Sequence, residues 1–415
     1  MVLPTVRSTA VRSTARSRRV LGAALVGLLA VTAAGAAVGV APAGATGAAA
    51  ATTTADTTPP CDALCRSIAT EGQALVTGPG GPPGAIVLVD RDGTTAVYSF
   101  GTSQVGTTDT ISPSTHLRLA SVSKMYSGAV ALALVAKGEL RLSSQVGSYV
   151  HDLPAAWRKV TLAQLLQHTS GIPDFIRSAG FGPDITANPY DPPSRFGLVR
   201  LAFDDRMNFR PGTGYHYSNS DNELVGLMVQ AVAHRSYEHE LATLVTGPLG
   251  LADTSLPQTE DLPAPYAHGY QVGKDAAPDD VTNGFSAGWS WASGGIVATP
   301  TDVDHFVRAY VRGALTTPAV HAAQFTFRPG SSEPPGPGTN AAGLAVFRYR
   351  TPCGTVYGHT GNTLGFTQFA ASDAAGNRSV VVQVNGQVTP DEATAPAFAH
   401  LLALEGSAVC AALAP

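Results

Sequence analysis

The apolar residues of this 415-residue chain form strand-like runs near both ends and helix-like patterns between them. Residues 85–89 are continuously apolar, and the next four residues, Asp90-Arg91-Asp92-Gly93, are typical of a hairpin. Residues 94–100 are therefore predicted to form the returning strand. Further strand-like runs lie at residues 343–349, 355–359, 366–372 and 379–384. The two groups predict one antiparallel sheet built from both ends of the chain.

Helical patterns occupy the sequence between and beside these strands. The longest apolar pattern covers residues 121–137 and ends at Gly138, a typical helix terminator. Thr299 and Pro300 suit the cap and first turn of a helix that runs to about Arg312. Other helices are expected at residues 59–77, 160–167, 222–233 and 390–404. The predicted fold class is α+β, with helices covering the sheet and a mostly helical insertion over residues 139 to about 290.

The first 45 residues have the pattern of a secretory signal peptide. Residues 1–19 are basic, residues 20–40 are uncharged and apolar, and Ala43-Gly44-Ala45 offers a cleavage site. Ser17-Arg18-Arg19-Val20-Leu21 also resembles a twin-arginine signal. An uncleaved anchor is the alternative, because the apolar run could span a bilayer, but its Ala/Gly-rich composition favours cleavage.

We therefore expect a protein exported to the cell wall or the medium, without a stable membrane anchor. Residues 46–60 are rich in Ala, Thr and Pro and are predicted to be a disordered linker. Residues 61–415 form the remaining domain, in which no later run was predicted to span a membrane.

The charge balance limits the class of binding partner, and the cysteine content bears on the disulfides of the protein. When the five arginines of the predicted signal peptide are left out, the chain has 21 basic and 30 acidic residues, a net charge of −9. This balance argues against a nucleic-acid partner, which needs a basic face. The four cysteines suggest two disulfides in an oxidising compartment, with three connectivities open. We favour Cys353–Cys410 and Cys61–Cys65, although the second pair would need a non-helical turn.

A first candidate motif is Ser121-Val122-Ser123-Lys124, at the start of the long apolar helix. Positions i and i+3 lie on one helix face, so the serine hydroxyl and the lysine amine can meet. A lysine kept neutral by desolvation can remove the serine proton and create a nucleophile. Only Lys124 among the four lysines has a serine three positions before it. A solvated lysine that happens to follow a serine is the alternative.

A second candidate motif, Tyr217-Ser218-Asn219, follows 96 residues later and is the only Y-x-N among twelve tyrosines. A phenol can relay a proton between nucleophile and leaving group, and Asn219 can hydrogen-bond a substrate amide. A third motif, His359-Thr360-Gly361, lies at the end of a predicted strand. A glycine at a strand edge lets an extended substrate approach and pair with the backbone. Structural roles for Tyr217 and His359 are the alternatives.

The three motifs, in this order and on these elements, resemble the penicillin-recognising serine hydrolases. That family includes class C β-lactamases, D-alanyl-D-alanine carboxypeptidases and related esterases. Leu165-Leu166-Gln167-His168-Thr169-Ser170-Gly171 resembles a structural segment of the family, and the similarity covers roughly residues 62–408. It implies a five-stranded antiparallel sheet flanked by helices, with an inserted, mostly helical lobe.

The resemblance also implies a role for each motif residue. Ser121 would be the acylated nucleophile, Lys124 its base partner and Tyr217 the general acid/base. The oxyanion hole would be formed by the backbone N–H groups of Ser121 and Asn362. Asn219 would bind a substrate amide, and the third motif would line the opposite wall, with no metal or other cofactor. The residues assigned to that wall are His359, Thr360 and Gly361.

The third motif points to a subfamily. His-Thr-Gly resembles secreted actinobacterial D-Ala-D-Ala carboxypeptidases, where most class C β-lactamases have Lys-Thr-Gly. Such enzymes bind the terminal carboxylate with an arginine on the preceding strand, for which Arg348 and Arg350 are candidates. The leading prediction is an exported, monomeric, penicillin-binding carboxypeptidase that acts on peptidoglycan stem peptides. If neither arginine faces the site, an esterase or aminopeptidase is favoured over a carboxypeptidase.

The sequence leaves other interpretations open. A β-lactamase is one, and a penicillin sensor that is acylated once without turnover is another. Gly284-Phe285-Ser286-Ala287-Gly288 matches the nucleophile elbow of α/β-hydrolases but lacks the strand before it and the helix after it. His234, Glu238 and His239 lack a metal-protease spacing and are expected on a helix surface.

Overall fold

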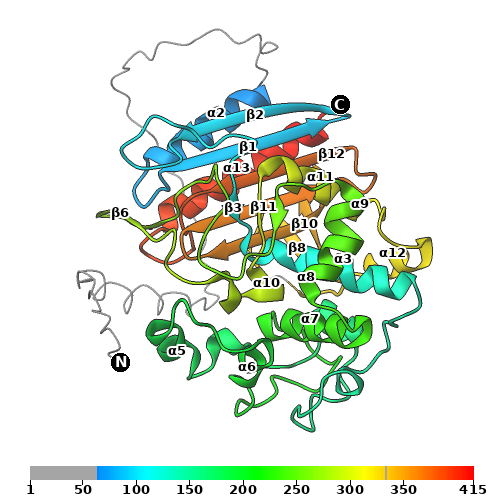
Figure 1. Cartoon of the computed structure of the whole chain (residues 1–415). Helices are drawn as coiled ribbons and strands as arrows, with labels where there is room; N and C mark the ends of the chain where they lie inside the picture. The colour runs from blue at the N-terminus through cyan, green and yellow to red at the C-terminus, as the bar shows by residue number, and fades with distance from the viewer. Residues whose placement is uncertain (1–62, 332–333) are drawn as a thin grey trace, which may run out of the picture.

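A seven-stranded antiparallel sheet forms the centre of the computed structural model, which describes residues 63–331 and 334–415 (Figure 1). The strand order is β2-β1-β12-β11-β10-β9-β8. The strands are β1 Gly84–Arg91, β2 Thr94–Gly101, β8 Thr339–Ala342, β9 Phe347–Thr351, β10 Gly354–Thr363, β11 Phe366–Ser372 and β12 Arg378–Val384. The predicted signal peptide, linker and Cys61 lie outside the described residues.

The sheet joins the two ends of the chain, as predicted. Strand β1 pairs antiparallel with β12, with Val87 opposite Val382, while β2 returns along the other side of β1. Five strands, β2-β1-β12-β11-β10, make up the sheet that the resemblance implies, and β9 and β8 extend it to seven. Both faces of β1 and β12 are buried, which explains the continuous apolar runs at residues 85–89 and 380–382.

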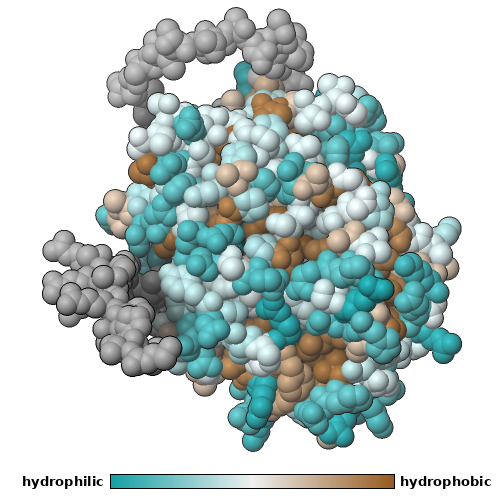
Figure 2. All heavy atoms as spheres, in the orientation of Figure 1, coloured by the Kyte–Doolittle hydropathy of each residue, from teal (hydrophilic) through white to brown (hydrophobic). Residues whose placement is uncertain are grey.

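Helices cover both faces of the sheet. One face packs against α2 (Ala63–Thr77) and α13 (Ala395–Leu413), which also contact each other. The other face packs against α11 (Pro300–Val311), beside which lies the apolar helix α3 (Ser123–Ala136) (Figure 1). Alternate strand residues therefore enter two separate cores: Val382 faces α13, and Val381 belongs to the core around α3. On the face shown in Figure 2, hydrophobic residues are seen mainly in recesses between hydrophilic ones.

The middle of the chain forms a mostly helical lobe, shown below the sheet in Figure 1. Its helices are α4 Leu162–Leu166, α5 Phe181–Ala187, α6 Arg195–Arg200, α7 Asn219–Ala233, α8 Tyr237–Leu241, α9 Gly247–Leu249 and α10 Trp291–Gly294. Helix α12 (Pro318–Gln324) follows α11. Short strands and a hairpin connect the lobe to the sheet: β3 Leu117–Arg118, β4 Thr254–Ser255 and β7 Val297–Ala298, with β5 Tyr270–Gly273 and β6 Ala276–Asp280.

Of the local predictions, the cap of α11 is confirmed and one predicted strand is partly wrong. Helix α11 has the predicted cap, because the Asp302 backbone N–H donates to the Thr299 hydroxyl at 3.3 Å. The strand predicted at 343–349 is wrong in its first half. The chain turns there: Gly343 N–H donates to Val346 O at 2.8 Å, and Ala345 has a φ of 52°. This turn is buried against the α3 core, so its apolar residues reflect burial rather than strand structure.

Helix α13 corrects a second prediction. It begins at Ala395 rather than residue 390, and by length and composition it could cross a membrane, which the sequence analysis did not anticipate. Its apolar residues instead pack against β1, β12 and α2. Burial in this core accounts for its composition.

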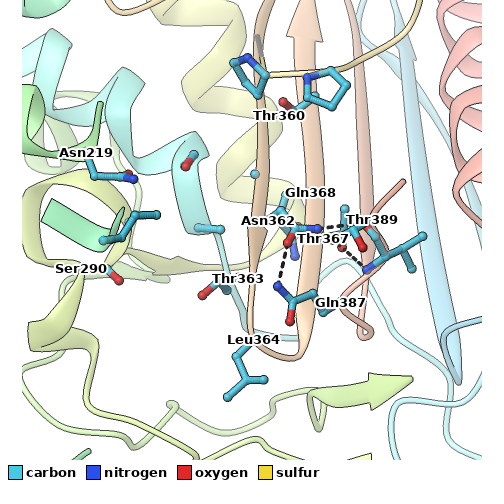
Figure 3. Close-up of a pocket in the computed structure, with 18 of the residues that line it drawn as sticks. Asn219, Ser290, Thr360, Asn362, Thr363, Leu364, Thr367, Gln368, Gln387 and Thr389 are labelled. Atoms are coloured by element: carbon cyan, nitrogen blue, oxygen red, sulfur yellow. Dashed lines mark hydrogen bonds between the residues drawn. The ribbon is translucent and has the colours of Figure 1, made fainter. Parts of the chain in front are cut away.

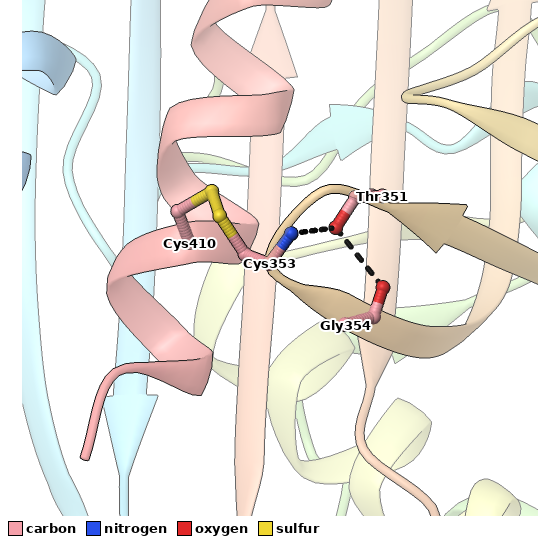
Figure 4. The surroundings of a disulfide bond; sticks show 4 residues. All are labelled: Thr351, Cys353, Gly354 and Cys410. Carbon is pink, nitrogen blue, oxygen red and sulfur yellow. Dashed lines mark hydrogen bonds between the residues drawn. A yellow bond between two sulfur atoms is a disulfide. The ribbon is translucent and has the colours of Figure 1, made fainter.

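A disulfide ties α13 to the sheet. Cys353, in the turn between β9 and β10, is bonded to Cys410 in α13, with a Cα–Cα distance of 5.1 Å (Figure 4). The turn is also held by Thr351, whose hydroxyl donates to Gly354 O at 3.0 Å. The predicted Cys353–Cys410 pair is confirmed, and Cys61–Cys65 stays a prediction.

Candidate active site

The first motif forms a tight turn that leads into α3. Ser121 lies in a 3₁₀ turn (Ala120–Val122) directly before α3, whose first twelve residues are buried. A helix buried on all sides is a rigid support. Ser121 and Lys124 are one turn apart, and Lys124 Nζ donates to Ser121 Oγ at 3.0 Å. The predicted contact between hydroxyl and amine is present.

Lys124 is fully enclosed and has two further acceptors. Its Nζ donates to Asn219 Oδ1 at 2.6 Å and to the Ser293 carbonyl oxygen at 2.8 Å. Burial lowers the pKa of Lys124 to about 7, outweighing Asp174, Glu223 and Asp221, which raise it. An appreciable fraction is therefore neutral near pH 7, so that Lys124 can accept the Ser121 proton.

Tyr217 lies immediately before α7 and above Lys124. Its ring centroid is 4.9 Å from Lys124 Nζ, and its buried hydroxyl has no hydrogen-bond partner within residues 63–331 and 334–415. Burial raises the pKa of Tyr217 well above 10, and a contact with the Ser121 hydroxyl opposes that rise. Tyr217 therefore stays protonated at neutral pH and can donate a proton beside Ser121.

Asn219 connects Lys124 to a carboxylate that the sequence analysis did not single out. Asn219 Nδ2 donates to Asp174 Oδ2 at 3.0 Å, and its backbone N–H donates to Asp174 Oδ1 at 3.1 Å. With Oδ1 already bound to Lys124, one Nδ2 hydrogen remains for a substrate carbonyl. Asn219 thus positions Lys124 as well as facing the cavity.

The third motif lies where β10 becomes a free edge. Strand β9 pairs with β10 only as far as Gly358, so from His359 onward β11 is the strand that pairs with β10. A Cβ at Gly361 would lie 2.4 Å from Leu119 O and 3.2 Å from Ser121 N. Only glycine allows this approach, which brings the backbone of β10 beside Ser121.

Asn362 follows at this edge and lines the cavity. Its Nδ2 donates to Thr367 Oγ1 at 3.0 Å and to Val388 O at 2.8 Å, and Gln387 Nε2 donates to its Oδ1 at 3.0 Å. The side chain is therefore anchored away from Ser121. Thr363 and Leu364 continue the wall beyond it, as Figure 3 shows.

His359 is buried behind this wall rather than exposed in it. Its Nδ1 contacts the Thr360 carbonyl oxygen, and its ring centroid is 6.1 Å from that of Tyr217. Burial, and then the nearby Lys124, lower the pKa of His359 to about 3. It is therefore neutral and packs against Tyr217, whereas Thr360 and Gly361 line the cavity directly.

The two candidate arginines do not reach the cavity. Arg348 is opposite Tyr357 in the β9–β10 ladder, and its guanidinium carbon is 4.8 Å from the Phe327 ring centroid. Arg350 is exposed. Neither is among the described residues that line the cavity. The prediction that Arg348 binds a substrate carboxylate is not supported by this placement.

Buried acids around Lys124 were missed by the sequence analysis. Asp221 accepts hydrogen bonds from Ser170 Oγ at 2.6 Å and contacts His168 Nδ1 at 3.1 Å. Glu223 accepts the Ser293 N–H at 3.1 Å, and burial raises its pKa to about 7. The sequence does contain a pattern that could have indicated Asp221 and Glu223, because these acidic residues interrupt the buried start of α7. Their proximity to Lys124 is a tertiary contact that spacing does not reveal.

The competing nucleophile has a structural role. Ser286 is fully buried, caps a short 3₁₀ turn and donates from Oγ to Gln258 O at 2.9 Å. Glu238, one of the residues considered for metal binding, accepts a hydrogen bond from Trp291 Nε1 at 2.8 Å. These contacts explain both residues without catalysis.

A Ser–Lys–Tyr centre between an antiparallel sheet and a helical lobe defines a penicillin-recognising serine hydrolase. The beta-lactamase family model matches residues 73–405, and the chain belongs to this family. Its fold is accordingly the β-lactamase/transpeptidase-like α+β fold.

Individual relatives cover only part of the sequence. The chain is 27% identical to Protein flp of Staphylococcus aureus (strain N315) over 231 residues, 54% of this chain and 45% of that protein. It is 30% identical to Penicillin-binding protein 4 of Amycolatopsis lactamdurans over 239 residues, 55% of this chain and 59% of the relative. The chain thus spans about half the length of these relatives.

Solved structures share the fold over most of the chain. A D-stereospecific amidohydrolase from Streptomyces sp. has a TM-score of 0.71 at 24% identity, covering 81% of this chain and 98% of that one. D-amino acid amidase from Ochrobactrum anthropi SV3 has a TM-score of 0.71 at 22% identity, covering 85% and 98%. At these identities the similarity concerns the fold.

Proposed function

We propose that this protein is an exported serine hydrolase that cleaves amide bonds through an acyl-enzyme on Ser121. The observation that carries the proposal is the 3.0 Å contact between Ser121 Oγ and a buried Lys124 whose pKa is about 7. Lys124 removes the Ser121 proton as Oγ attacks the carbonyl carbon, and Tyr217 delivers a proton to the leaving nitrogen. Water then hydrolyses the ester, which releases the acid and restores Ser121.

D-amino-acid amides and short D-peptides are the substrate class that we favour. A carboxypeptidase needs a cation for the substrate carboxylate, and neither Arg348 nor Arg350 lines the cavity. Arg177 is the sole basic residue among the described residues of the lining, whereas Asp174, Asp391 and Glu405 are acidic. A free carboxylate is disfavoured in such surroundings. Two proteins of the same fold are named as a D-stereospecific amidohydrolase and a D-amino acid amidase.

A D-Ala-D-Ala carboxypeptidase remains the second candidate. The free edge of β10, with Thr360 and Gly361 in the cavity wall, suits the backbone of an extended stem peptide. One relative is named Penicillin-binding protein 4. Both proposals include export directed by the predicted signal peptide.

Parallel assays separate the two candidates. We expect release of ammonia from D-phenylalaninamide, little from its L-isomer, and slower release of D-Ala from an N-acyl-D-Ala-D-Ala peptide. Replacement of Ser121 by Ala should abolish all of these activities. Faster cleavage of the D-Ala-D-Ala peptide than of D-amides would reverse our order of preference. Activity that survives in Ser121→Ala would exclude the proposed mechanism.

A further inference from the structure

The cavity at Ser121 continues past β10 to the opposite face of the sheet. The same cavity of about 250 Å³ is lined by Ser121 and Tyr217 and by Leu401, Leu402 and Glu405 of α13. Thr360, at the free edge of β10, belongs to the same lining and is labelled in Figure 3. Groups buried behind the strand can therefore meet a molecule that reacts at Ser121.

Two buried polar groups, Glu405 and Thr360, line this continuation, and Tyr349 is buried beside them without lining it. Glu405 is 2% exposed, Thr360 8% and Tyr349 fully buried. In the part of the chain that the structure describes, Glu405 Oε2 and Thr360 Oγ1 lack a hydrogen-bond partner. Burial raises the pKa of Tyr349, a contact with the Thr360 hydroxyl opposes that rise, and the nearby Glu405 carboxyl adds to it. Unlike Tyr349, Glu405 and Thr360 can therefore meet a molecule in the cavity. Unpaired buried polar groups are costly, and each needs a partner.

The enclosure of these groups is tight. A Cβ at Gly336 would lie 2.6 Å from Tyr349 Cε1 and 3.1 Å from Thr360 Cγ2, so the backbone packs closely against both side chains there. Phe398, Leu401 and Leu402 form an apolar wall beside Glu405. Among the described residues, no salt bridge to Glu405 is formed, and burial raises its pKa well above the usual value.

We propose that Glu405 and Thr360 bind a primary ammonium group at the end of an apolar stem, as in a lysine-like substrate residue, with Tyr349 supporting Thr360 from behind. An ammonium group has three hydrogens to donate, and the two carboxylate oxygens of Glu405 and the Thr360 hydroxyl supply three acceptors. Burial raises the pKa of Glu405, so its proton passes to solvent as the ammonium group binds and neutralises the carboxylate, while the leucine wall accommodates the methylene groups. This inference rests on the proposed amide hydrolysis for its biological use, but the binding itself does not require turnover.

Binding of pentylammonium, with 1-pentanol as the uncharged comparison, tests the site directly. Calorimetry on the Ser121→Ala protein at pH 6.5 should show at least tenfold tighter binding of the amine. Glu405→Gln in the same background should remove this preference, whereas Glu392→Gln should keep it. Glu392 is an exposed acid near the start of α13 that does not line the cavity, so it controls for the lost charge. Equal affinity for amine and alcohol, or equal effects of the two variants, would overturn the inference.

Pairs of substrates that differ only in a side-chain ammonium group test whether the ammonium site is used in catalysis. D-lysine and D-norleucine are compared both as the acyl residue and as the leaving residue of otherwise identical D-amides and D-peptides. We expect a tenfold preference in kcat/KM for lysine in one of these positions, which Glu405→Gln abolishes and Tyr349→Phe weakens. Tyr349→Phe also serves if Glu405→Gln fails to fold. A lack of lysine preference in both positions would contradict the inference. A complete absence of hydrolysis would count against the proposed function, while the pentylammonium result would still decide the ammonium site.

Discussion

At the scale of single residues, the proposed catalysis depends on how burial changes the pKa of the Lys124 amine. Lys124 donates to Ser121, Asn219 and the Ser293 carbonyl, and its pKa of about 7 results from burial. A solvated lysine would stay protonated at pH 7 and could not remove a serine proton. By lowering its pKa, burial thus allows Lys124 to act as a base, while its hydrogen bonds keep its amine next to the Ser121 hydroxyl.

The pH dependence of acylation follows from this pKa. The rate constant for acylation of Ser121 should rise as pH increases from 5 to 8, because deprotonation of Lys124 through a pKa of about 7 creates the base. Stopped-flow acylation by a chromogenic β-lactam measures it. Lys124→Ala should lower the rate roughly 10²- to 10⁴-fold and remove the inflection. A wild-type profile that is flat between pH 5 and 8 would contradict this role.

At the scale of elements, the free edge of β10 determines what can approach Ser121. The register places Gly361 opposite Gln368 of β11, with Leu119 O on the other side of the strand. The β9 pairing ends at Gly358, because the chain turns away before Phe347. A glycine at position 361 and a shortened β9 are both needed for an accessible edge.

Replacement of Gly361 by Ala tests this arrangement. The added Cβ would lie 2.4 Å from Leu119 O, so β10 or the Ser121 turn must shift. We expect a loss of kcat/KM of at least 10²-fold, since misplacement by about 1 Å can cost that much. Gly93→Ala, at a positive-φ turn with open space around it, controls for backbone strain alone. Equal kinetics in the Gly361→Ala and wild-type proteins would show that the close approach is unimportant.

At the scale of the whole molecule, buried acids reduce the stability of the fold near neutral pH. Burial raises the pKa of Glu223 to about 7, and it also raises the pKa of Glu405 and Asp221. A carboxyl whose folded pKa is raised contributes stability below its unfolded pKa of about 4.5, and this contribution is lost as pH rises through the folded pKa. These acids therefore lower the stability of the protein as pH rises from 5 to 7, whereas His168 and His359, whose pKa values burial lowers, act in the opposite direction.

Chemical denaturation at several pH values tests this linkage. Between pH 5 and 7, the slope of the free energy of unfolding against pH should be more positive for Ser121→Ala/Glu223→Gln than for Ser121→Ala. The double variant thus gains stability relative to its parent, because it lacks the acid whose pKa is about 7. Glu139, exposed after α3, provides a matched Glu→Gln control that should leave the slope unchanged. A Glu223→Gln slope as steep as that of its parent would mean that Glu223 ionises normally in the folded protein.

The disulfide acts at the same scale. It closes a loop of 57 residues between the β9–β10 turn and α13. Replacing both cysteines by Ser should lower the free energy of unfolding by about 2–4 kcal/mol, through the greater entropy of the unfolded chain. Urea denaturation of the double variant and wild type measures the difference. Equal midpoints and slopes for the two proteins would contradict a stabilising role.

Local sequence patterns were enough to predict most of the sheet and the main residues of the candidate site. Ser121 and Lys124 are one helical turn apart, and Tyr217 and Gly361 follow on elements with recognisable patterns. Asp174 and Glu405 could not be found in this way, because tertiary packing brings them to the cavity from distant segments. The orientation of Arg348 also could not be predicted, since it depends on the register of β9 after the buried turn at residues 343–346.

The central claim is that Ser121 is the nucleophile, and intact mass measurement after brief exposure to benzylpenicillin tests it most directly. The account predicts that the wild-type protein gains the mass of one penicillin, or destroys the antibiotic rapidly, and that Ser121→Ala does neither. A persistent adduct indicates a slowly deacylating penicillin-binding enzyme or a sensor, and rapid loss indicates a β-lactamase. An adduct on Ser121→Ala, or no reaction of the wild type with either the antibiotic or D-amides, would contradict the account.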